Sequence, residues 1–312
     1  MKKVFIDGSA GTTGLRIYER LSARRDIELI TLSEELRKDT NARREMLNKA
    51  DVAFLCLPDA AAVEAVSLIE NAATVVIDTS TAHRVSDGWT YGFAEIGGLR
   101  EKIARSTRIA NPGCHASGFI SLAAPLVEKG IIPKDAQLSC FSLTGYSGGG
   151  KKMIADYEND EIKSSLEAPR MYGLTQQHKH LPEMAKICGL ESAPIFSPIV
   201  SSFYSGMEVV IPLFANQING SIDDIKQIYK GYYTGRLVRF ADAADESGFL
   251  SASALSGRDD MQISVYGNAE RITLVSRFDN LGKGASGAAI QNMNIVLGVD
   301  ETAGLDLGGM DK

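Results

Sequence analysis

The sequence has few of the features that mark a secreted, membrane-bound or nucleic-acid-binding protein. Its formal net charge of −6 gives no basic excess that would favour nucleic acid or an anionic membrane as a partner. No apolar run approaches the roughly 20 residues of a membrane span. The opening residues Met1–Asp7 reach an aspartate too early for a signal peptide, so we expect a cytoplasmic protein.

Cysteine and histidine are scarce, with four of each. The cysteines form no CxxC pair and no zinc-type spacing, which is typical of reduced thiols in a reducing compartment. Cys56, Cys140 and Cys188 lie in apolar surroundings and are expected to be structural. His178 and His180 have no third ligand at a sensible spacing, so we predict no metal site.

The first third of the chain predicts a dinucleotide-binding unit. Lys3–Asp7 is an apolar first strand, and a helical pattern begins at Leu15. Glycines at every third position between them allow a tight turn and a close approach of backbone to a pyrophosphate at a helix N-terminus. The predicted cofactor-binding residues in this loop are Gly8, Ala10, Gly11, Thr12, Thr13 and Gly14.

The end of the second predicted strand, Ile27–Leu32, bears on the choice of cofactor. NAD enzymes commonly place an acidic residue there to hold the ribose hydroxyls. Here Ser33 comes first, and Ser33 with Arg37 or Lys38 could hold a 2′-phosphate, which favours NADP. Glu34 and Glu35 leave NAD open.

Further strands and helices alternate up to residue 112, which predicts a doubly wound parallel sheet. Strands are expected at 51–57, 74–78 and 107–110, with a helix at 59–69. The loop after the strand at 74–78 carries Ser80 and Arg84. Because ligands bind at the carboxyl ends of such strands, the glycine loop, this loop and Cys114 are expected at one crevice.

Cys114 follows Asn111, Pro112 and Gly113 in a predicted strand–turn–helix passage. In the first helical turn the unpaired backbone N–H groups stabilise a thiolate. A presented thiolate suits a nucleophile, and a buried structural thiol is the alternative.

From residue 138 the pattern changes to a second, α+β domain with a mixed or antiparallel sheet. Strands are expected at 138–144, 195–200, 207–214 and 271–278, with a helix at 222–233 and a flexible polar loop at 146–152. A small-residue helix at 282–297 could pack back on the first domain. We predict a dinucleotide-binding domain of residues 1–116 with 283–312, and a substrate and oligomerisation domain of 117–282. The last residues look weakly ordered.

A catalytic thiolate usually has a histidine nearby. His115 adjoins Cys114, but adjacent helical side chains diverge, so His115 is discounted. His178 and His180 share a face if the segment is extended, and both could reach the crevice. His180 is favoured as the base because Pro182 restrains the backbone beside it, but the assignment stays open.

The glycine loop, Asn111–Cys114, His178–Glu183 and Gly282–Asn294 occur in this order. Together they resemble the short-form N-acetyl-gamma-glutamyl-phosphate reductases, of the aspartate-semialdehyde dehydrogenase-like superfamily, over almost the whole chain. Leu181 and His115 stand where the longer forms of the family tend to carry threonine and tyrosine. The resemblance implies a Rossmann-like domain plus a glyceraldehyde-3-phosphate dehydrogenase-like domain, with the final helix folded back onto the nucleotide domain.

The resemblance also implies an NADP(H)-dependent reduction of an acyl phosphate to an aldehyde through a Cys114 thioester, in arginine biosynthesis. His180 and His178 are the other catalytic residues that it implies. It adds Ser80 and Asn292 to the cofactor-binding residues. It implies that Arg84, Asn111 and Gly149 bind the substrate, although Arg84 could instead form a surface ion pair with Asp87. The implied partners are a small-molecule acyl phosphate and further copies of the chain, as a dimer or tetramer.

Three other functions remain open from the sequence. A related reductase would act on aspartyl phosphate or an aminoadipate analogue. A thiol hydrolase is the second, and its glycine loop would be incidental to its function. A dinucleotide-sensing protein is the third, and it would have no need for a presented cysteine beside a histidine pair.

Overall fold

The computed structural model describes residues 1–308, and the chain divides into two compact units. Unit 1 comprises residues 1–94, 98–112 and 285–305, and unit 2 comprises residues 95–97, 113–284 and those from 306 onward. The expectation of weak order at the C-terminus falls partly on 309–312, outside the described residues. The predicted fold class, a parallel Rossmann-like sheet with a second α+β domain, is confirmed.

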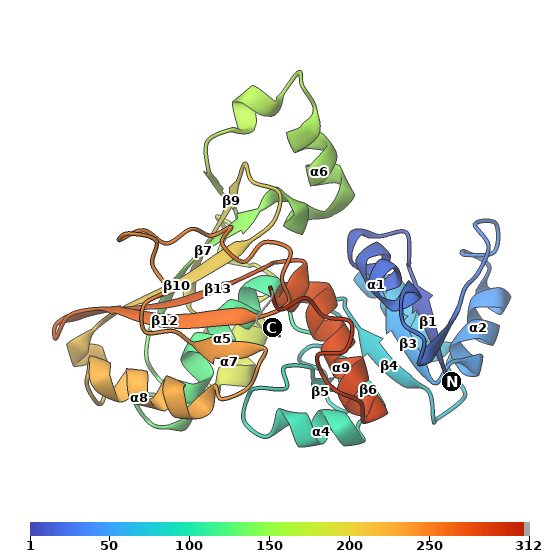
Figure 1. Cartoon of the computed structure of the whole chain (residues 1–312), viewed down its shortest axis with the longest axis horizontal. Helices are drawn as coiled ribbons and strands as arrows, with labels where there is room; N and C mark the ends of the chain where they lie inside the picture. Colours follow the sequence, from blue (N-terminus) through green and yellow to red (C-terminus); the bar gives the residue numbers. More distant parts are fainter. Residues whose placement is uncertain (309–312) are drawn as a thin grey trace. The chain divides into compact units, whose positions relative to one another are not determined.

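Unit 1 is built on a parallel sheet whose strand order is β2-β1-β3-β4-β6-β5 (Figure 1). Its elements are β1 (Lys2–Asp7), α1 (Thr12–Ser22), β2 (Ile27–Ile30), α2 (Thr40–Lys49), β3 (Val52–Leu55), α3 (Asp59–Ser67), β4 (Val75–Asp78), β5 (Thr90–Tyr91), α4 (Leu99–Arg105), β6 (Arg108–Ala110) and α9 (Gly287–Leu297). Successive strands lie on opposite sides of β1, so the strand order reverses there. Doubly wound sheets bind ligands at such a reversal.

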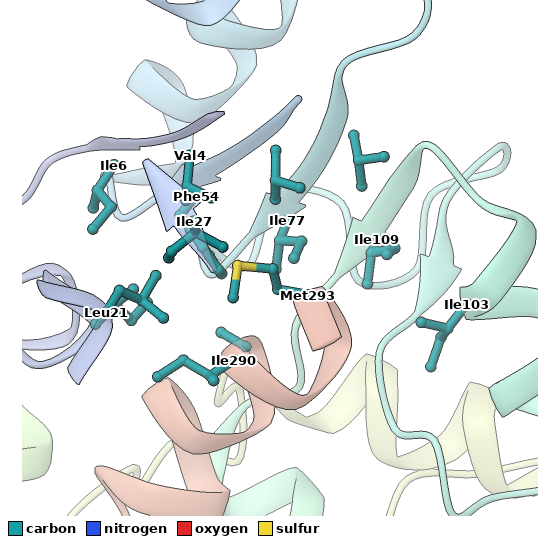
Figure 2. Close-up of a cluster of buried hydrophobic side chains, with 14 of the residues drawn as sticks. Val4, Ile6, Leu21, Ile27, Phe54, Ile77, Ile103, Ile109, Ile290 and Met293 are labelled. Atoms are coloured by element: carbon teal, nitrogen blue, oxygen red, sulfur yellow. The ribbon is translucent and has the colours of Figure 1, made fainter. Parts of the chain in front are cut away.

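The core of unit 1 contains side chains from the beginning of the chain and from α9, near its C-terminal end. Ile290 and Met293 of α9 pack among buried side chains of the sheet, including Phe54 and Ile77 (Figure 2). A turn of π-helix, Gly282–Ser286, precedes α9 where the sequence predicts one continuous helix. Each large apolar side chain buried in this way stabilises the fold by about 1.5–3 kcal/mol.

The sequence analysis does not anticipate α2. Its N-cap is Asp39, whose carboxylate accepts a hydrogen bond from the Ala42 backbone N–H. Its buried face consists of Leu47 and Arg43. An arginine on the inner face breaks the apolar periodicity on which the prediction depends.

Unit 2 is built on a mixed sheet in the order β11-β12-β13-β10-β7-β9-β8. Its elements are α5 (Cys114–Glu128), β7 (Ser139–Gly145), α6 (Gly150–Glu158), β8 (Arg170–Met171), α7 (Leu181–Cys188), β9 (Ile195–Ser201), β10 (Met207–Phe214), α8 (Ile222–Tyr232), β11 (Val238–Phe240), β12 (Met261–Gly267) and β13 (Arg271–Phe278). Helices α5 and α8 pack on the sheet, and α7 packs on α5 (Figure 1). Along β7 the residues Cys140, Ser142 and Thr144 are buried, whereas Phe141 is exposed.

Helix α5 carries a proline in its interior, Pro125. Because proline has no N–H, the carbonyl of Ser121 loses its usual helical donor. The Tyr233 hydroxyl donates to that carbonyl, and the Tyr229 hydroxyl donates to the carbonyl of Leu122. Side chains from α8 and the residue after it therefore satisfy backbone groups in the middle of α5.

The prediction of a flexible polar loop at 146–152 is wrong. Residues Tyr146–Gly149 form a 3₁₀ turn that leads directly into α6. The buried ring of Tyr157 in α6 lies 4.8 Å from the ring of Tyr146 and packs near Leu166 and Val200. These contacts come from later in the sequence, so the local glycine-rich pattern could not reveal them.

Candidate active site

The glycine loop of unit 1, residues Gly8–Gly14, depends on the absence of side chains at two positions. Gly8 has a positive φ of 88°, and a Cβ there would lie 2.3 Å from the backbone oxygen of Cys56. A Cβ on Gly14 would lie 2.4 Å from the oxygen of Gly8. Gly11 is the N-cap of α1, and its N–H donates to the oxygen of Gly8. The loop therefore approaches the backbone at the end of β3 closely and leads directly into α1.

A cavity of about 360 Å³ opens beside the glycine loop. It is lined by the loop residues Gly8, Ser9, Ala10 and Gly11, by strand residues such as Leu29 and Ile30, and by Arg37, Lys38 and Arg43. Backbone amides, an apolar wall and cationic side chains together fit a dinucleotide.

The structure separates the residues predicted to hold a 2′-phosphate. Arg37 and Lys38 line the cavity. Ser33 is exposed, lies outside the lining, and donates from Oγ to Glu35. Arg37 pairs with Glu34 at 3.3 Å on the surface.

A buried ion pair lies at the same cavity. Nε and Nη2 of Arg43 donate to the Asp7 carboxylate, and Nη1 donates to Glu64. Burial raises the pKa of Asp7, and the hydrogen bonds from Arg43 oppose that rise. The sequence analysis missed this pair, because its partners lie 36 residues apart.

The loop after β4 is held by Asp78. The buried carboxylate of Asp78 accepts hydrogen bonds from the N–H and Oγ of Ser80, and it lies 2.6 Å from Nδ1 of His83. The ring of His83 stacks on Trp89 at 4.0 Å. Ser80 and His83 are thereby fixed at the carboxyl end of the sheet.

Arg84, Asn111 and Asn292, which are predicted to bind substrate or cofactor, lie close together in unit 1. Nε of Arg84 donates to the backbone oxygen of Asn111, and Nη2 donates to the oxygen of Thr79. Asn111 donates to the oxygen of Ala285 and accepts a hydrogen bond from the amide of Asn292. Asn292 also donates to the oxygen of Gly92, and within residues 1–308 its buried Oδ1 has no hydrogen-bond partner. That oxygen is an acceptor suited to an amide N–H.

In unit 2, Cys114 is the first residue of α5 and Gly113 is its N-cap. The Gly113 N–H donates to Oε2 of Glu183 at 3.1 Å. The other carboxylate oxygen of Glu183 lies 4.0 Å from Nε2 of His180, and both side chains are buried. A carboxylate thus connects the start of α5, where Cys114 lies, to one of the predicted histidines.

The expectation of an extended segment at His178–His180 is wrong. The N–H of Leu181 donates to the oxygen of His178, so these residues form a turn, and His180 has helical dihedral angles. The turn follows from Pro182 in the first turn of α7. The two imidazoles still meet, with ring centroids 4.7 Å apart.

His115 joins the same group, although the sequence analysis discounts it. Its ring centroid lies 5.7 Å from that of His178 and 5.6 Å from that of His180. We call these three rings the histidine cluster. His115 is contacted by residues that the sequence analysis missed, namely Ser142, Tyr172 and Phe196. No pattern in the sequence connects them, since β7, β8 and β9 bring them together.

Gly149 ends the 3₁₀ turn before α6, and a Cβ there would lie 2.5 Å from the sulfur of Met153. Among the described residues, no group of three histidine, cysteine or acidic side chains is arranged to hold a metal. The cysteines, all within that range, form no disulfide. No helix of residues 1–308 is both long and apolar enough to cross a membrane.

Comparison with known proteins adds family information to this geometry. Residues 3–106 match the family model "Semialdehyde dehydrogenase, NAD binding domain", and residues 114–280 match "Semialdehyde dehydrogenase, dimerisation domain". N-acetyl-gamma-glutamyl-phosphate reductase 2 of Nostoc sp. is 45% identical over 97% of this chain and 99% of its own length. The N-acetyl-gamma-glutamyl-phosphate reductase of Brucella ovis is 45% identical over 95% of this chain and 99% of its own.

Solved structures show the same fold. Aspartate semialdehyde dehydrogenase II from Vibrio cholerae has a TM-score of 0.73 at 16% identity, covering 95% of this chain and 98% of that one. Aspartate semialdehyde dehydrogenase with NADP from Candida albicans has a TM-score of 0.70 at 17% identity, with the same coverage.

Proposed function

Because the chain belongs to the N-acetyl-gamma-glutamyl-phosphate reductase family, we propose that it reduces N-acetyl-glutamyl 5-phosphate to N-acetyl-glutamate 5-semialdehyde with NADPH. This reaction belongs to arginine biosynthesis. The observation that carries the proposal is Cys114 at the start of α5, with Glu183 joining that start to His180.

Cys114 acts as the nucleophile. Its thiolate attacks the acyl carbon, the C–S bond forms, and the C–O bond to phosphate breaks to leave a thioester. The first-turn amides of α5 stabilise the thiolate. When bound, NADPH supplies the hydride that reduces the thioester carbon. The C–S bond then breaks to release the aldehyde and restore the thiolate.

His180 is the base that takes the thiol proton and later returns it to the developing oxyanion. Glu183 stabilises its imidazolium form from 4.0 Å. His178 is less suited to this role, because its Nδ1 accepts the backbone N–H of His180. Its Nε2 then carries the proton of the neutral ring, so His178 donates a hydrogen bond to substrate.

NADP(H) is held by the glycine loop and the cationic wall of the cavity. Gly8, Gly11 and Gly14 keep the backbone of Ala10, Thr12 and Thr13 accessible to the pyrophosphate. Arg37, with Lys38 beside it, lines the cavity and holds the 2′-phosphate. Ser33, which lies outside the cavity lining and donates to Glu35, contributes less to cofactor binding. Ser80 and the unpartnered Oδ1 of Asn292 complete the cofactor site.

Arg84 supplies the positive charge for the phosphoryl group of the substrate, since two backbone carbonyls orient its guanidinium. Asn111 supports Arg84 through one of those carbonyls, and its amide is already bonded to Ala285 and Asn292. Gly149 contributes to the substrate site through its backbone, since the space beside its Cα is taken by the side chain of Met153.

The enzyme is a homo-oligomer, a dimer or tetramer. The match of residues 114–280 to a dimerisation domain supports this. So do the exposed side chains Phe141, Ile195 and Phe214 on strands of the unit 2 sheet, at 46%, 65% and 59% exposure. Apolar sheet residues exposed to this degree are typical of an interface. Phe141→Glu should lower the sedimenting mass, and Phe249→Glu, in an exposed loop, is the control. The absence of a disulfide among the four cysteines fits the cytoplasm.

The decisive test runs the reaction backwards with N-acetylglutamate semialdehyde, NADP and phosphate, and follows the absorbance of reduced nicotinamide. Phosphate-dependent reduction is expected, and Cys114→Ser should abolish it. A preference for aspartate semialdehyde or an aminoadipate semialdehyde would overturn the substrate assignment. Hydrolysis of thioesters without any binding of NADPH would instead indicate a thiol hydrolase. Binding of NADPH without turnover of any substrate would indicate a dinucleotide-sensing protein.

A further inference from the structure

Ser142, His115 and Tyr172 form a continuous hydrogen-bond chain in unit 2. The Oγ atom of Ser142 lies 2.6 Å from Nδ1 of His115, and the phenol oxygen of Tyr172 lies 2.7 Å from Nε2. His115 is 3% exposed and Ser142 is 0% exposed. The reaction described above gives none of the three a role.

His115 is neutral in this chain. Burial and the neighbouring His178 lower the pKa of His115 to about 3. A neutral imidazole has one N–H donor and one lone pair. One ring nitrogen therefore donates along the chain, and the other accepts.

The hydrogen atoms can be arranged in two ways. If Nδ1 carries the proton, it donates to Ser142, Tyr172 donates to Nε2, and the Ser142 hydrogen needs another acceptor. Within residues 1–308, His115 is the one side-chain or backbone group bonded to Ser142 Oγ. A fully buried donor without an acceptor is disfavoured because its desolvation is not compensated.

If instead Nε2 carries the proton, Ser142 donates to Nδ1 and Nε2–H donates to the phenol oxygen. Every buried hydrogen then has an acceptor, so this tautomer is preferred. The hydroxyl hydrogen of Tyr172 is left to point away from His115. Tyr172 is only half-buried, and its ring lies 6.0 Å from that of His178.

The phenol also lies beside the first turn of α5, because it is hydrogen-bonded to the ring of His115, the residue that follows Cys114 in that turn. Burial, and secondarily the charge on Cys114, raise the pKa of Tyr172, so the hydroxyl keeps its proton. A protonated hydroxyl near a thiolate, with its oxygen already accepting a hydrogen bond, is a donor suited to that sulfur.

We propose that Tyr172 donates a hydrogen bond to the sulfur of Cys114, and that His115 and Ser142 are positioning residues that turn the hydroxyl toward it. The bond stabilises the thiolate as nucleophile and again when the C–S bond breaks and the electron pair returns to sulfur. This second role depends on the proposed function, whereas the contact in the resting enzyme does not.

The first test reads the proton on His115 directly in the wild-type protein. The chain has only four histidines, so ¹⁵N-histidine labelling gives few imidazole signals, and His115→Gln identifies that of His115. Long-range ¹H–¹⁵N spectra should show a protonated Nε2 and an unprotonated Nδ1. A proton on Nδ1 would overturn the proposal whether or not the enzyme reduces any acyl phosphate.

The second test measures the apparent pKa of the Cys114 thiol from the pH dependence of iodoacetamide alkylation. Loss of a hydrogen bond to the charged form raises a thiol pKa, so Tyr172→Phe should raise it by about one unit. Tyr157→Phe is the matched control, since that hydroxyl accepts from Arg170 and belongs to a different cluster. Equal values for wild type and Tyr172→Phe would contradict the proposal.

The proposed hydrogen-bond chain predicts how substitutions of its own residues change the pKa of the Cys114 thiol. His115→Gln should keep a near-wild-type thiol pKa, because its amide N–H can replace Nε2–H, whereas His115→Leu should raise the pKa. Ser142→Ala removes the preference for the His115 tautomer with the proton on Nε2, so it should raise the thiol pKa by about half a unit. The control is Ser276→Ala, at a buried serine outside the hydrogen-bond chain, which should leave the thiol pKa unchanged. A purely structural role would leave the thiol pKa unchanged in all of them. In the reductase assay Tyr172→Phe should lower kcat about 10- to 100-fold with little change in KM.

Discussion

The glycine loop of unit 1 and the histidine cluster of unit 2 are built from different parts of the chain. The loop uses the backbone of seven consecutive residues, and its shape depends on missing side chains at Gly8 and Gly14. The cluster uses side chains from α5, from the turn before α7, and from β7 and β9 around it. A backbone site is sensitive to any added atom, whereas a side-chain site is sensitive to the loss of one group and its proton. Substitutions in the two sites can therefore test this difference.

Cys114→Ser should remove the reaction and leave the glycine loop untouched. A hydroxyl has a far higher pKa than a thiol and stays protonated at the start of α5. We expect reductase activity to fall at least about 1000-fold while the NADPH dissociation constant, measured by fluorescence, is unchanged. A serine variant that kept more than about a tenth of the wild-type rate would exclude the covalent mechanism.

Gly8→Ala should damage unit 1 far more than Gly11→Ala. The new Cβ at Gly8 meets a backbone oxygen at 2.3 Å with φ at +88°, whereas at Gly11 the nearest atom is 3.5 Å away. NADPH affinity should fall about 100-fold for Gly8→Ala, since the loop must move, and stability should fall by about 1–3 kcal/mol. Titration calorimetry and urea unfolding measure both effects. Equal losses in the two variants would show that the loop conformation is not what binds the cofactor.

Substitutions of His178 and His180 should differ in their effect on the pKa of the Cys114 thiol. His180→Ala should move the thiol pKa toward about 8.5 in alkylation experiments, because the paired base is lost. His178→Ala should keep the thiol reactive and lose turnover, because its Nδ1 is already occupied by a backbone N–H. The reverse pattern would make His178 the base. No change in either variant would leave α5 alone as the source of activation.

Acid should weaken unit 2 through His115. Its pKa falls from 6.5 to about 3 on folding, so between these values the unfolded chain binds more protons than the folded one. The free energy of unfolding should therefore decrease by about 1.4 kcal/mol per pH unit as the pH falls from about 6 to 4. Urea unfolding of the wild type and of His115→Gln across this range measures the slope. The variant should lose that part of the slope, and identical slopes would show that another group controls acid stability.

The smallest effect concerns the edge of the cavity. Arg37→Ala should lower the NADP-to-NAD ratio of kcat/KM about 5- to 10-fold, since it removes an exposed charge near the 2′-phosphate. Ser33→Ala, outside the cavity lining, should change the ratio less than about twofold. A larger effect of Ser33→Ala would make the serine the phosphate ligand. A wild-type preference for NAD would make Glu34 the ribose ligand instead.

Features that depend on neighbouring residues could be predicted from the amino-acid sequence. Lys3–Asp7 followed by Gly8–Gly14 predicts a strand, a tight turn and a helix, because dihedral preferences and glycine spacing act locally, and the structure has β1 at Lys2–Asp7 and α1 from Thr12. The parallel class of the first sheet, the position of Cys114 at a helix start, and the family follow from such local motifs. The resemblance of these motifs to a known family is what indicates an acyl-phosphate reductase.

Which side chains meet in the site depends on contacts between residues far apart in the sequence. His115 and Tyr172 are 57 residues apart, and Gly113 and Glu183 are 70 residues apart. Local periodicity even argued against His115, because it describes the direction of a side chain on its own helix and not what approaches from other strands. The prediction of an extended segment at His178–His180 failed for a different, local reason, since Pro182 and the start of α7 impose a turn. Backbone geometry is set mainly by short-range sterics, whereas a hydrogen-bond network exists only after the whole sheet has closed around it.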